Sequence, residues 1–231
     1  MPLRKILIRL LLPPAWRGSR DQAAIGLREF ADAELDSAWQ SLHAMNAAHD
    51  PVLRAALFQH AFEELQHHAV FNELSKNYSA VLPPILALER QPLLQEKARS
   101  NPLLSFYAAE SVGEGDIAGD FAAYLEAVPF EDVRKAFKLI LEDEKGHALY
   151  TRSAFSRLAA SRREQLVELA KARGGRLYKS WLRISRSMAE MMADVALALI
   201  YFMTGFLLKG TCRKRMTMRS DLEKDSPAKS R

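Results

Sequence analysis

Two Glu-x-x-His motifs are the residues of this sequence that are best placed to do chemistry. One motif runs from Glu64 to His67 and the other from Glu144 to His147. Positions i and i+3 lie on the same face of a helix, so the carboxylate and the imidazole of each motif can bind the same ion. Because motifs this short also arise by chance, the residues around them decide whether they indicate a metal site.

Each motif follows a glutamate that stands in a mostly apolar segment. Glu34 precedes Glu64 by 30 residues, and Glu110 precedes Glu144 by 34 residues. At about 1.5 Å per residue, about 15 residues along one helix and as many back along the next bring the two positions level. A buried layer of such groups would be very costly without a metal to compensate them. The sequence therefore predicts a two-metal site whose ligands are Glu34, Glu64, His67, Glu110, Glu144 and His147.

Other features accompany this ligand pattern. The segment Phe71 to Leu74 follows the first motif closely, Glu110 is followed by Ser and Val, and a proline-interrupted crossover and an apolar C-terminal helix complete the pattern. One Glu from each of two helices and Glu-x-x-His from each of two others form the ligand set of the ferritin-like di-iron carboxylate proteins. The sequence resembles that superfamily over residues 21 to 160, and within it demethoxyubiquinone hydroxylase, an enzyme of ubiquinone biosynthesis. Residues 143–151 are also similar to acyl carrier protein desaturases.

The residue before each motif glutamate is also acidic, Glu63 in the first motif and Asp143 in the second. A metal-bound imidazole usually donates its other N–H to a carboxylate, which fixes the tautomer. The resemblance implies that each acid reaches the histidine of the opposite motif, so that Asp143 would hold His67 and Glu63 would hold His147. A solvated acid on the flank of the helix is the alternative for both.

Three further residues near the predicted ligands are candidate catalytic residues. Glu114 lies one helical turn after Glu110, between two glycines. An extra or shifting ligand, a proton donor, an ordinary polar residue and a replacement for Glu110 as the ligand all stay open for it. Tyr107 and Tyr150 flank the motif residues at helical spacing, where core packing competes with a hydrogen bond to a ligand or a redox role. We expect positions outside the ligand set for His43, His49, His60 and His68.

Long helices must position these residues. The apolar pattern predicts helices over 21–48, 51–78, 102–127, 131–160 or onward to 172, and 177–208. Asp21 and Asp50 are the expected N-caps of the first two helices. Gly174 and Gly175 are expected to break the chain before the last one.

The predicted fold class is all-α, a ferritin-like four-helix bundle with one long crossover, an amphipathic N-terminal segment and an apolar C-terminal helix. Prolines within residues 79–101 mark the crossover, which we expect to carry a short helix over 85–89. Pro13 and Pro14 are expected to close the N-terminal segment. The predicted divisions are 1–20 for that segment, 21–172 for the bundle, 176–208 for the apolar helix and 209–231 for a basic disordered tail.

The distribution of charged and apolar residues along the chain indicates where in the cell the protein is expected. The net charge of +5 concentrates in the first twenty residues and after Leu208, and basic ends beside apolar segments favour an anionic membrane surface over nucleic acid. Residues 195–208 carry no charge but are shorter than the roughly 20 residues that cross a bilayer, so a core helix and an interfacial, lipid-collecting helix both stay open. The single Cys212 excludes a disulfide within one chain, and the N-terminus does not fit a secretory signal. We expect a cytoplasmic protein at the inner face of the membrane.

These predictions lead to a function. Carboxylate-rich sites with two nitrogen ligands suit Fe or Mn, and the resemblance implies two irons per chain, O₂ as co-substrate and an external reductant. We expect a di-iron monooxygenase, a hydroxylase or desaturase, for a hydrophobic lipid-like substrate such as a quinone precursor or an acyl chain. Its partners would be that substrate, an electron-donor protein or a reduced nucleotide, and the membrane surface, but no nucleic acid; a homo-oligomer stays open. The alternatives are a ferritin-like or rubrerythrin-like oxidase that handles iron or peroxide, and a non-catalytic membrane-associated helical scaffold.

Overall fold

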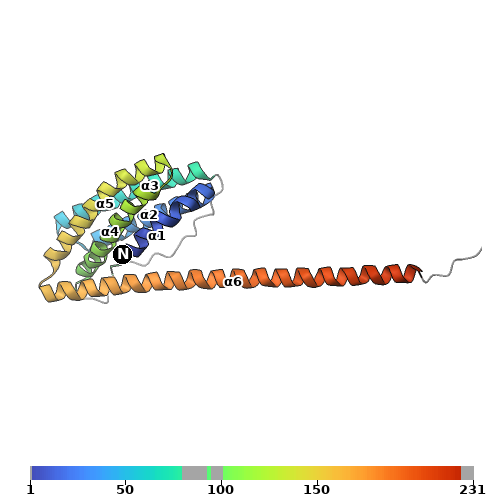
Figure 1. The fold of residues 1–231 in the computed structure, drawn as a ribbon. Coiled ribbons are helices and arrows are strands. Elements are labelled where there is room, and N and C mark those ends of the chain that lie inside the picture. Colours follow the sequence, from blue (N-terminus) through green and yellow to red (C-terminus); the bar gives the residue numbers. More distant parts are fainter. Residues whose placement is uncertain (1, 80–92, 95–100, 225–231) are drawn as a thin grey trace, which may run out of the picture. The chain divides into compact units, whose positions relative to one another are not determined.

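The computed structural model describes residues 2–79, 93–94 and 101–224, and every regular element in these ranges is an α-helix. The helices are α1 (Pro2–Gly18), α2 (Arg20–Ala47), α3 (Pro51–Tyr78), α4 (Pro102–Ala127), α5 (Glu131–Leu158) and α6 (Arg162–Lys224) (Figure 1). The prediction of an all-α fold is therefore confirmed. The chain divides into two compact units, residues 1–174 and residues 175–231.

Helices α2 to α5 form a four-helix bundle in the first unit. Helix α2 packs along α3, α4 packs along α5, and contacts of α3 with α5 and of α2 with α4 join the two pairs (Figure 1). Residues 48–50 and 128–130 connect the helices of each pair, and connections this short make the paired helices antiparallel. The predicted bounds of α3 and α4 are confirmed. The predicted short helix over 85–89, like most of the crossover, lies outside the described residues.

Capping residues set where the bundle helices begin. The side chain of Asp50 caps α3, and Pro51 occupies the first turn, as predicted. For α2 the prediction of Asp21 as the N-cap is wrong, because the hydroxyl of Ser19 accepts the hydrogen bond from the backbone N–H of Gln22 at 3.3 Å. Asp21 lies instead in the first turn, where its negative charge is favourable at the positive end of the helix dipole.

Helix α1 continues through Pro13 and Pro14, so the prediction that these prolines close the N-terminal segment is wrong. A proline inside a helix costs about 3 kcal/mol or more, and packing within the first unit offsets this cost. Trp16 is buried in an apolar cluster of the bundle, and Arg4 forms an ion pair with Asp120 of α4 at 3.0 Å. Contacts on both sides of the prolines therefore hold α1 against α2 and α4.

Helix α6 runs without interruption from Arg162 to Lys224. The break predicted at Gly174 and Gly175 does not occur, and the tail predicted to be disordered is helical over residues 209–224. A glycine inside a helix costs only about 1 kcal/mol, and no neighbouring atom within 4 Å of either glycine requires the chain to turn there. The basic residues 209–224 are rich in Lys, Arg and Met, which are good helix formers.

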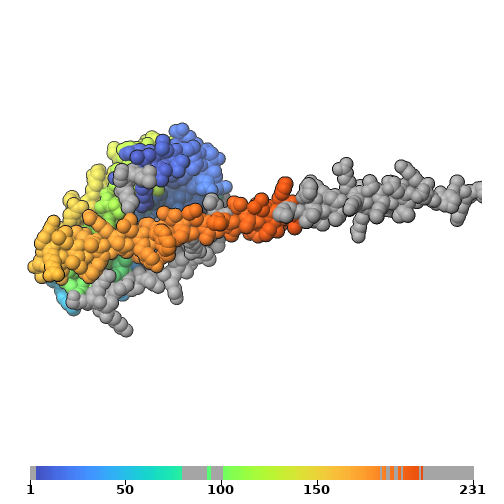
Figure 2. All heavy atoms as spheres, turned by 60° about the horizontal axis from the view of Figure 1, so that its bottom comes forward, coloured from blue at the N-terminus to red at the C-terminus, as the bar shows by residue number. Residues whose placement is uncertain are grey.

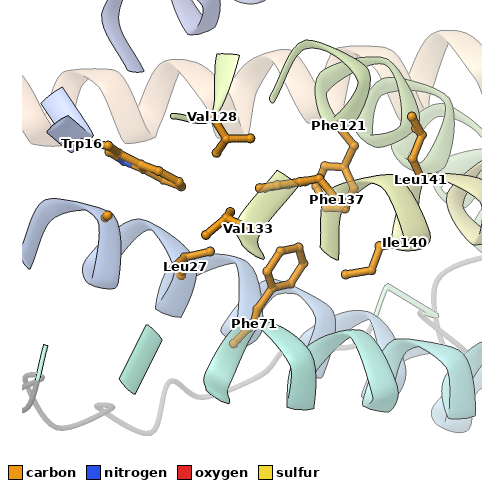
Figure 3. Close-up of a cluster of buried hydrophobic side chains, with 11 residues drawn as sticks. Trp16, Leu27, Phe71, Phe121, Val128, Val133, Phe137, Ile140 and Leu141 are labelled. Carbon is orange, nitrogen blue, oxygen red and sulfur yellow. The ribbon is translucent and has the colours of Figure 1, made fainter. Parts of the chain in front are cut away.

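Two clusters of apolar side chains fill the bundle. The first includes Trp16, Leu27, Phe71, Phe121 and Phe137 (Figure 3). The second includes Leu57, Leu104, Phe106, Tyr107 and Phe155. Helix α3 leads from Leu57 in the second cluster to Phe71 in the first, and α5 leads from Phe137 in the first to Phe155 in the second. Both Glu-x-x-His motifs lie between these residues, so apolar packing encloses them at both ends.

The second unit consists, in the part that the structure describes, of the remainder of α6, whose first part is orange in Figure 2. Large apolar side chains are exposed along it, and they are Leu177, Tyr178, Trp181, Leu182, Ile184, Met188, Met192, Val195, Leu197, Leu199, Ile200, Tyr201 and Phe202. So much exposed apolar surface indicates an interaction site. Within the described ranges, no helix combines the length and the apolar character that a membrane crossing needs.

Candidate metal centre

Seven ionisable side chains from four helices meet in one buried layer of the bundle. Each is 5% exposed or less, and they are Glu34 on α2, His60, Glu64 and His67 on α3, Glu114 on α4, and Glu144 and His147 on α5. Two groups of four, each with its ligand atoms within 4.8 Å of one another, are Glu34, Glu64, His67 and Glu144, and His60, Glu64, Glu114 and His147. Each group could hold a metal ion, and Glu64 belongs to both.

Glu64 and Glu144 each face more than one imidazole. The Oε1 atom of Glu64 is 2.9 Å from Nε2 of His60 and 3.1 Å from Nδ1 of His147. Its Oε2 atom is 3.9 Å from Nδ1 of His67. The Oε1 atom of Glu144 is 3.3 Å from Nδ1 of His67 and 3.9 Å from Nδ1 of His147. Both carboxylates would therefore be among the residues that hold metal ions in this layer.

Many inward-facing atoms of this layer have close neighbours but form no hydrogen bond among the described residues. They are Oε2 of Glu64, Nδ1 of His67, Oε2 of Glu114, both carboxylate oxygens of Glu144 and Nδ1 of His147. A buried polar atom without a partner costs about 1–3 kcal/mol, and native proteins contain few of them. Cations held by the two groups would satisfy these atoms together. The donor set therefore fits a metal centre on grounds independent of the sequence motifs.

The outward-facing nitrogen of each motif histidine is held by an acid from the opposite motif. The Nε2 atom of His67 lies 3.1 Å from Oδ2 of Asp143, and the Nε2 atom of His147 lies 2.8 Å from Oε2 of Glu63. These are the two pairs that the resemblance implied. A carboxylate on one ring nitrogen fixes the tautomer, so that the other nitrogen is available to a metal.

Burial and mutual repulsion shift the pKa values of the buried carboxyls. Burial raises the pKa of Glu34 well above its usual value, and the nearby carboxylate of Glu64 adds to this rise. Burial also raises the pKa of Glu114, and the charge of Glu144 adds to it. Burial would raise the pKa of Glu64 as well, but the neighbouring Glu34 carboxyl and the imidazoles of His147 and His60 lower it well below its usual value. Without a metal the layer therefore shares protons, which a bound cation would displace.

The carboxylates raise the pKa of both motif histidines. Burial alone would lower the pKa of His67, but Glu144 and Glu64 raise it above its usual value. Burial would also lower the pKa of His147, but the carboxylate of Glu64, 3.1 Å from Nδ1, outweighs burial and raises this pKa to about 9. In the metal-free protein the buried carboxylates thus favour the protonated, positively charged form of both imidazoles.

Of the two candidates on α4, Glu114 completes the second group, and Glu110 belongs to neither. The prediction placed Glu110 in the ligand set and left open that Glu114 replaces it, and the two groups favour that alternative. Glu110 is buried beside Glu114, whose pKa it helps to raise. The place where the chain turns explains why Glu114 takes this position. Residue 129, in the connection from α4 to α5, is midway between residues 114 and 144. In the same way residue 49, in the connection from α2 to α3, is midway between residues 34 and 64. An equal spacing of 30 residues in both helical hairpins, α2 with α3 and α4 with α5, is the sequence signal that identifies Glu114.

His60 is a residue of the layer that the motif spacing does not predict. It lies one helical turn before Glu64 and therefore on the same face of α3, which is the signal that could have revealed it. The remaining histidines lie outside the two groups. Among them, His68 is hydrogen-bonded to the backbone carbonyl of Ala31 at 2.7 Å, and His49 is exposed.

Tyr150 and Tyr107 lie beside the layer. The hydroxyl of Tyr150 is hydrogen-bonded to Nδ1 of His60. The hydroxyl of Tyr107 is buried and finds no partner in the part of the chain that the structure describes. Burial raises the pKa of both phenols, and their ring centroids are 6.5 Å apart. Tyr150 therefore contacts the layer directly, whereas Tyr107 packs against Tyr150.

No protein-family model, curated protein or solved structure matches this chain. The fold and the site by themselves define an all-helical protein with a four-helix bundle. Inside that bundle lie buried clusters of glutamate and histidine that could hold metal ions.

Proposed function

We propose that this chain is a di-iron, O₂-dependent oxygenase, a hydroxylase or desaturase, for a hydrophobic lipid-like substrate such as a quinone precursor or an acyl chain at a membrane surface. The observation that carries the proposal is the buried layer of carboxylates and imidazoles, many of whose inward-facing atoms form no hydrogen bond among the described residues. The resemblance to the ferritin-like di-iron carboxylate superfamily, and within it to demethoxyubiquinone hydroxylase, supports the same function.

The donor set favours iron. Carboxylates suit hard cations and imidazoles suit Fe, Zn and other late first-row ions, so a mixed set of both suits Fe(II). The residues that would hold two ions are Glu34, Glu64, His67, Glu114, Glu144 and His147. Bound iron, supplied with electrons by an external donor protein or a reduced nucleotide, would provide the redox chemistry that O₂-dependent oxidation of an organic substrate needs.

The chain's own residues prepare the site for such chemistry. Glu63 and Asp143 orient the two motif imidazoles from opposite helices. The apolar clusters at both ends of the layer exclude water. The hydroxyl of Tyr150 holds the ring of His60 through a hydrogen bond at the edge of the layer.

Apolar surfaces support a lipid-like substrate. The exposed apolar side chains of α1 are Ile6, Leu7, Leu10 and Leu11, and basic residues alternate with them. A second exposed apolar stretch covers residues 195–202 of α6. Helices that combine exposed apolar side chains with basic ones lie in the interface of anionic membranes. A substrate dissolved in such a membrane would reach a protein bound to its surface.

Metal content and reactivity toward O₂ test the proposal together. Protein purified without O₂ would be analysed for iron, reduced, and mixed with O₂ in the presence of vesicles that contain a quinone precursor or a fatty acyl lipid. We expect about two irons per chain, an O₂-dependent optical band and an oxidised lipid. Glu64→Ala and Glu144→Ala should lose all three. Glu73→Ala, which removes an exposed carboxylate of α3, is the matched control.

The outcomes separate the candidate functions. Iron and O₂ consumption without an oxidised lipid would favour an oxidase that handles iron or peroxide. No iron above background after reconstitution would overturn the site and favour a non-catalytic scaffold.

A further inference from the structure

His60 presents one ring nitrogen to the layer, and its other nitrogen is held from outside. The Nε2 atom lies 2.9 Å from Oε1 of Glu64 and 3.8 Å from Oε1 of Glu114, and Nδ1 is hydrogen-bonded to the hydroxyl of Tyr150. His67 and His147 show the same division, with Nδ1 toward the buried carboxylates and Nε2 on an acid. An imidazole fixed at its outer nitrogen is prepared to bind a cation through its inner nitrogen.

The position of His60 makes the two halves of the layer unequal. His60 belongs to the group that contains His147, and the ring centroids of these two residues are 4.0 Å apart. In the second hairpin the equivalent position, four residues before the motif glutamate, is Ile140, a buried member of the first apolar cluster. One group therefore has two imidazoles and two carboxylates, and the other has one imidazole and three carboxylates.

We propose that His60 is a third imidazole ligand of the metal centre, and that the position it shares with His147 binds the first ion and the carboxylate-rich position the second. This inference rests on the metal centre of the proposed function, but not on iron, O₂ or a lipid substrate. Imidazole suits late first-row ions such as Zn²⁺ and Fe²⁺, whereas carboxylates suit Mn²⁺ and Mg²⁺. The unequal positions thus favour filling in a fixed order, and they let two different metals occupy one centre.

The nitrogen NMR signals of the imidazoles test both parts of the proposal directly. The chain has six histidines, so protein labelled with ¹⁵N-histidine gives few signals. We expect the first equivalent of Zn²⁺ to move Nε2 of His60 and Nδ1 of His147 to metal-bound shifts, and the second to move Nδ1 of His67. His60→Gln and His67→Gln assign the signals, and His49→Gln, which removes an exposed imidazole, should leave all the changes intact. If a buried variant fails to fold, the others assign its signals by difference.

Calorimetric titration with Zn²⁺ adds a second readout. We expect His60→Gln to weaken the tighter binding step at least about tenfold and to leave the weaker step unchanged. A His60 signal that keeps its metal-free shift while those of His67 and His147 change would overturn the inference and leave the proposed function intact. A change at His67 before His60 would overturn the order of filling. No change at any histidine with Zn²⁺ and no binding of Fe²⁺ would remove the metal centre and the proposed function with it.

Discussion

The Oε2 atom of Glu63 on α3 lies 2.8 Å from Nε2 of His147 on α5. Asp143 on α5 reaches back in the same way to His67 on α3. Each hairpin of the bundle thus supplies the acid that holds the other hairpin's imidazole, and both acids are more exposed than the groups they hold. Because they lie outside the layer, these acids can be changed without placing a new group in the core.

We expect Glu63→Gln to weaken metal binding by about 10- to 100-fold with little effect on folding. The neutral amide lowers the basicity of His147 and no longer selects its tautomer. Zn²⁺ titration calorimetry measures the affinity, and circular dichroism checks the fold. Glu73→Gln, an exposed change on the same helix, should match the unaltered protein. Unaltered affinity in Glu63→Gln would show that the contact has no role in metal binding.

The two glutamates of α4 should behave differently. We expect Glu114→Gln to lose one of two bound ions, because Glu114 belongs to the second group. Glu110→Gln should keep both ions, because Glu110 belongs to neither group. Elemental analysis after equilibration with Fe²⁺ and removal of unbound metal gives the stoichiometry. The reverse pattern would restore Glu110 as the ligand on α4.

The metal-free protein should lose stability as pH rises. The pKa values of Glu34 and Glu114 are raised above 4.5, so the folded state binds these protons more tightly than the unfolded chain does, and stability falls above that pH. The pKa of His147, about 9 instead of 6.5, extends the loss through this window.

Urea unfolding at a series of pH values, with a chelator or with saturating Zn²⁺, measures this effect. We expect the free energy of unfolding of the metal-free protein to fall steadily from about pH 5 to about pH 9. The zinc-loaded protein should not show this fall, because cations replace the protons. A metal-free protein that becomes more stable over the same range would contradict the protonation of the layer.

Removing the two phenol hydroxyls should have opposite effects. Tyr150→Phe takes away the partner of His60 and should destabilise the protein by about 1–3 kcal/mol. Tyr107→Phe removes a buried hydroxyl that has no partner in the described ranges, so it should be neutral or stabilising. Denaturant unfolding measures both. A Tyr107→Phe variant that is stable but inactive would show that this hydroxyl contacts the substrate.

Phe71 anchors the first apolar cluster beside the layer. It is fully buried among aromatic rings, with the centroid of Phe137 5.2 Å away. We expect Phe71→Ala to cost about 3–5 kcal/mol of stability. Phe58→Ala, which removes an exposed ring from the same helix, should cost far less. Equal losses in thermal or urea unfolding would contradict the packing of the cluster.

The bundle helices were predictable because strong local signals mark their ends. Asp50 and Pro51 combine a side-chain cap with a fixed backbone angle, and both act within one turn of the helix start. The continuity of α1 and α6 was not predictable from Pro13 or Gly174. The proline penalty of about 3 kcal/mol or more and the glycine penalty of about 1 kcal/mol are offset by packing or by the rest of the helix, and the sequence alone does not give these contributions.

Most of the site was predictable because ligands on one helix face repeat at i and i+3. The choice between Glu110 and Glu114 depended on where the chain turns between α4 and α5, and a shift of one helical turn keeps either residue on the same face. His60 was missed because the Glu-x-x-His motif does not include the position one helical turn before its glutamate. Only the assembled bundle shows that its ring reaches the carboxylates of α3 and α4.

The equal spacing of the two hairpins means that one pattern of ligands occurs twice within one polypeptide, as it would occur twice in a dimer of two identical hairpins. Glu34 with Glu64 and His67, and Glu114 with Glu144 and His147, are two copies of one spacing in the sequence. In a true dimer every substitution occurs twice. Covalent linkage removes that constraint, and position 60 can be histidine while its counterpart, position 140, remains isoleucine.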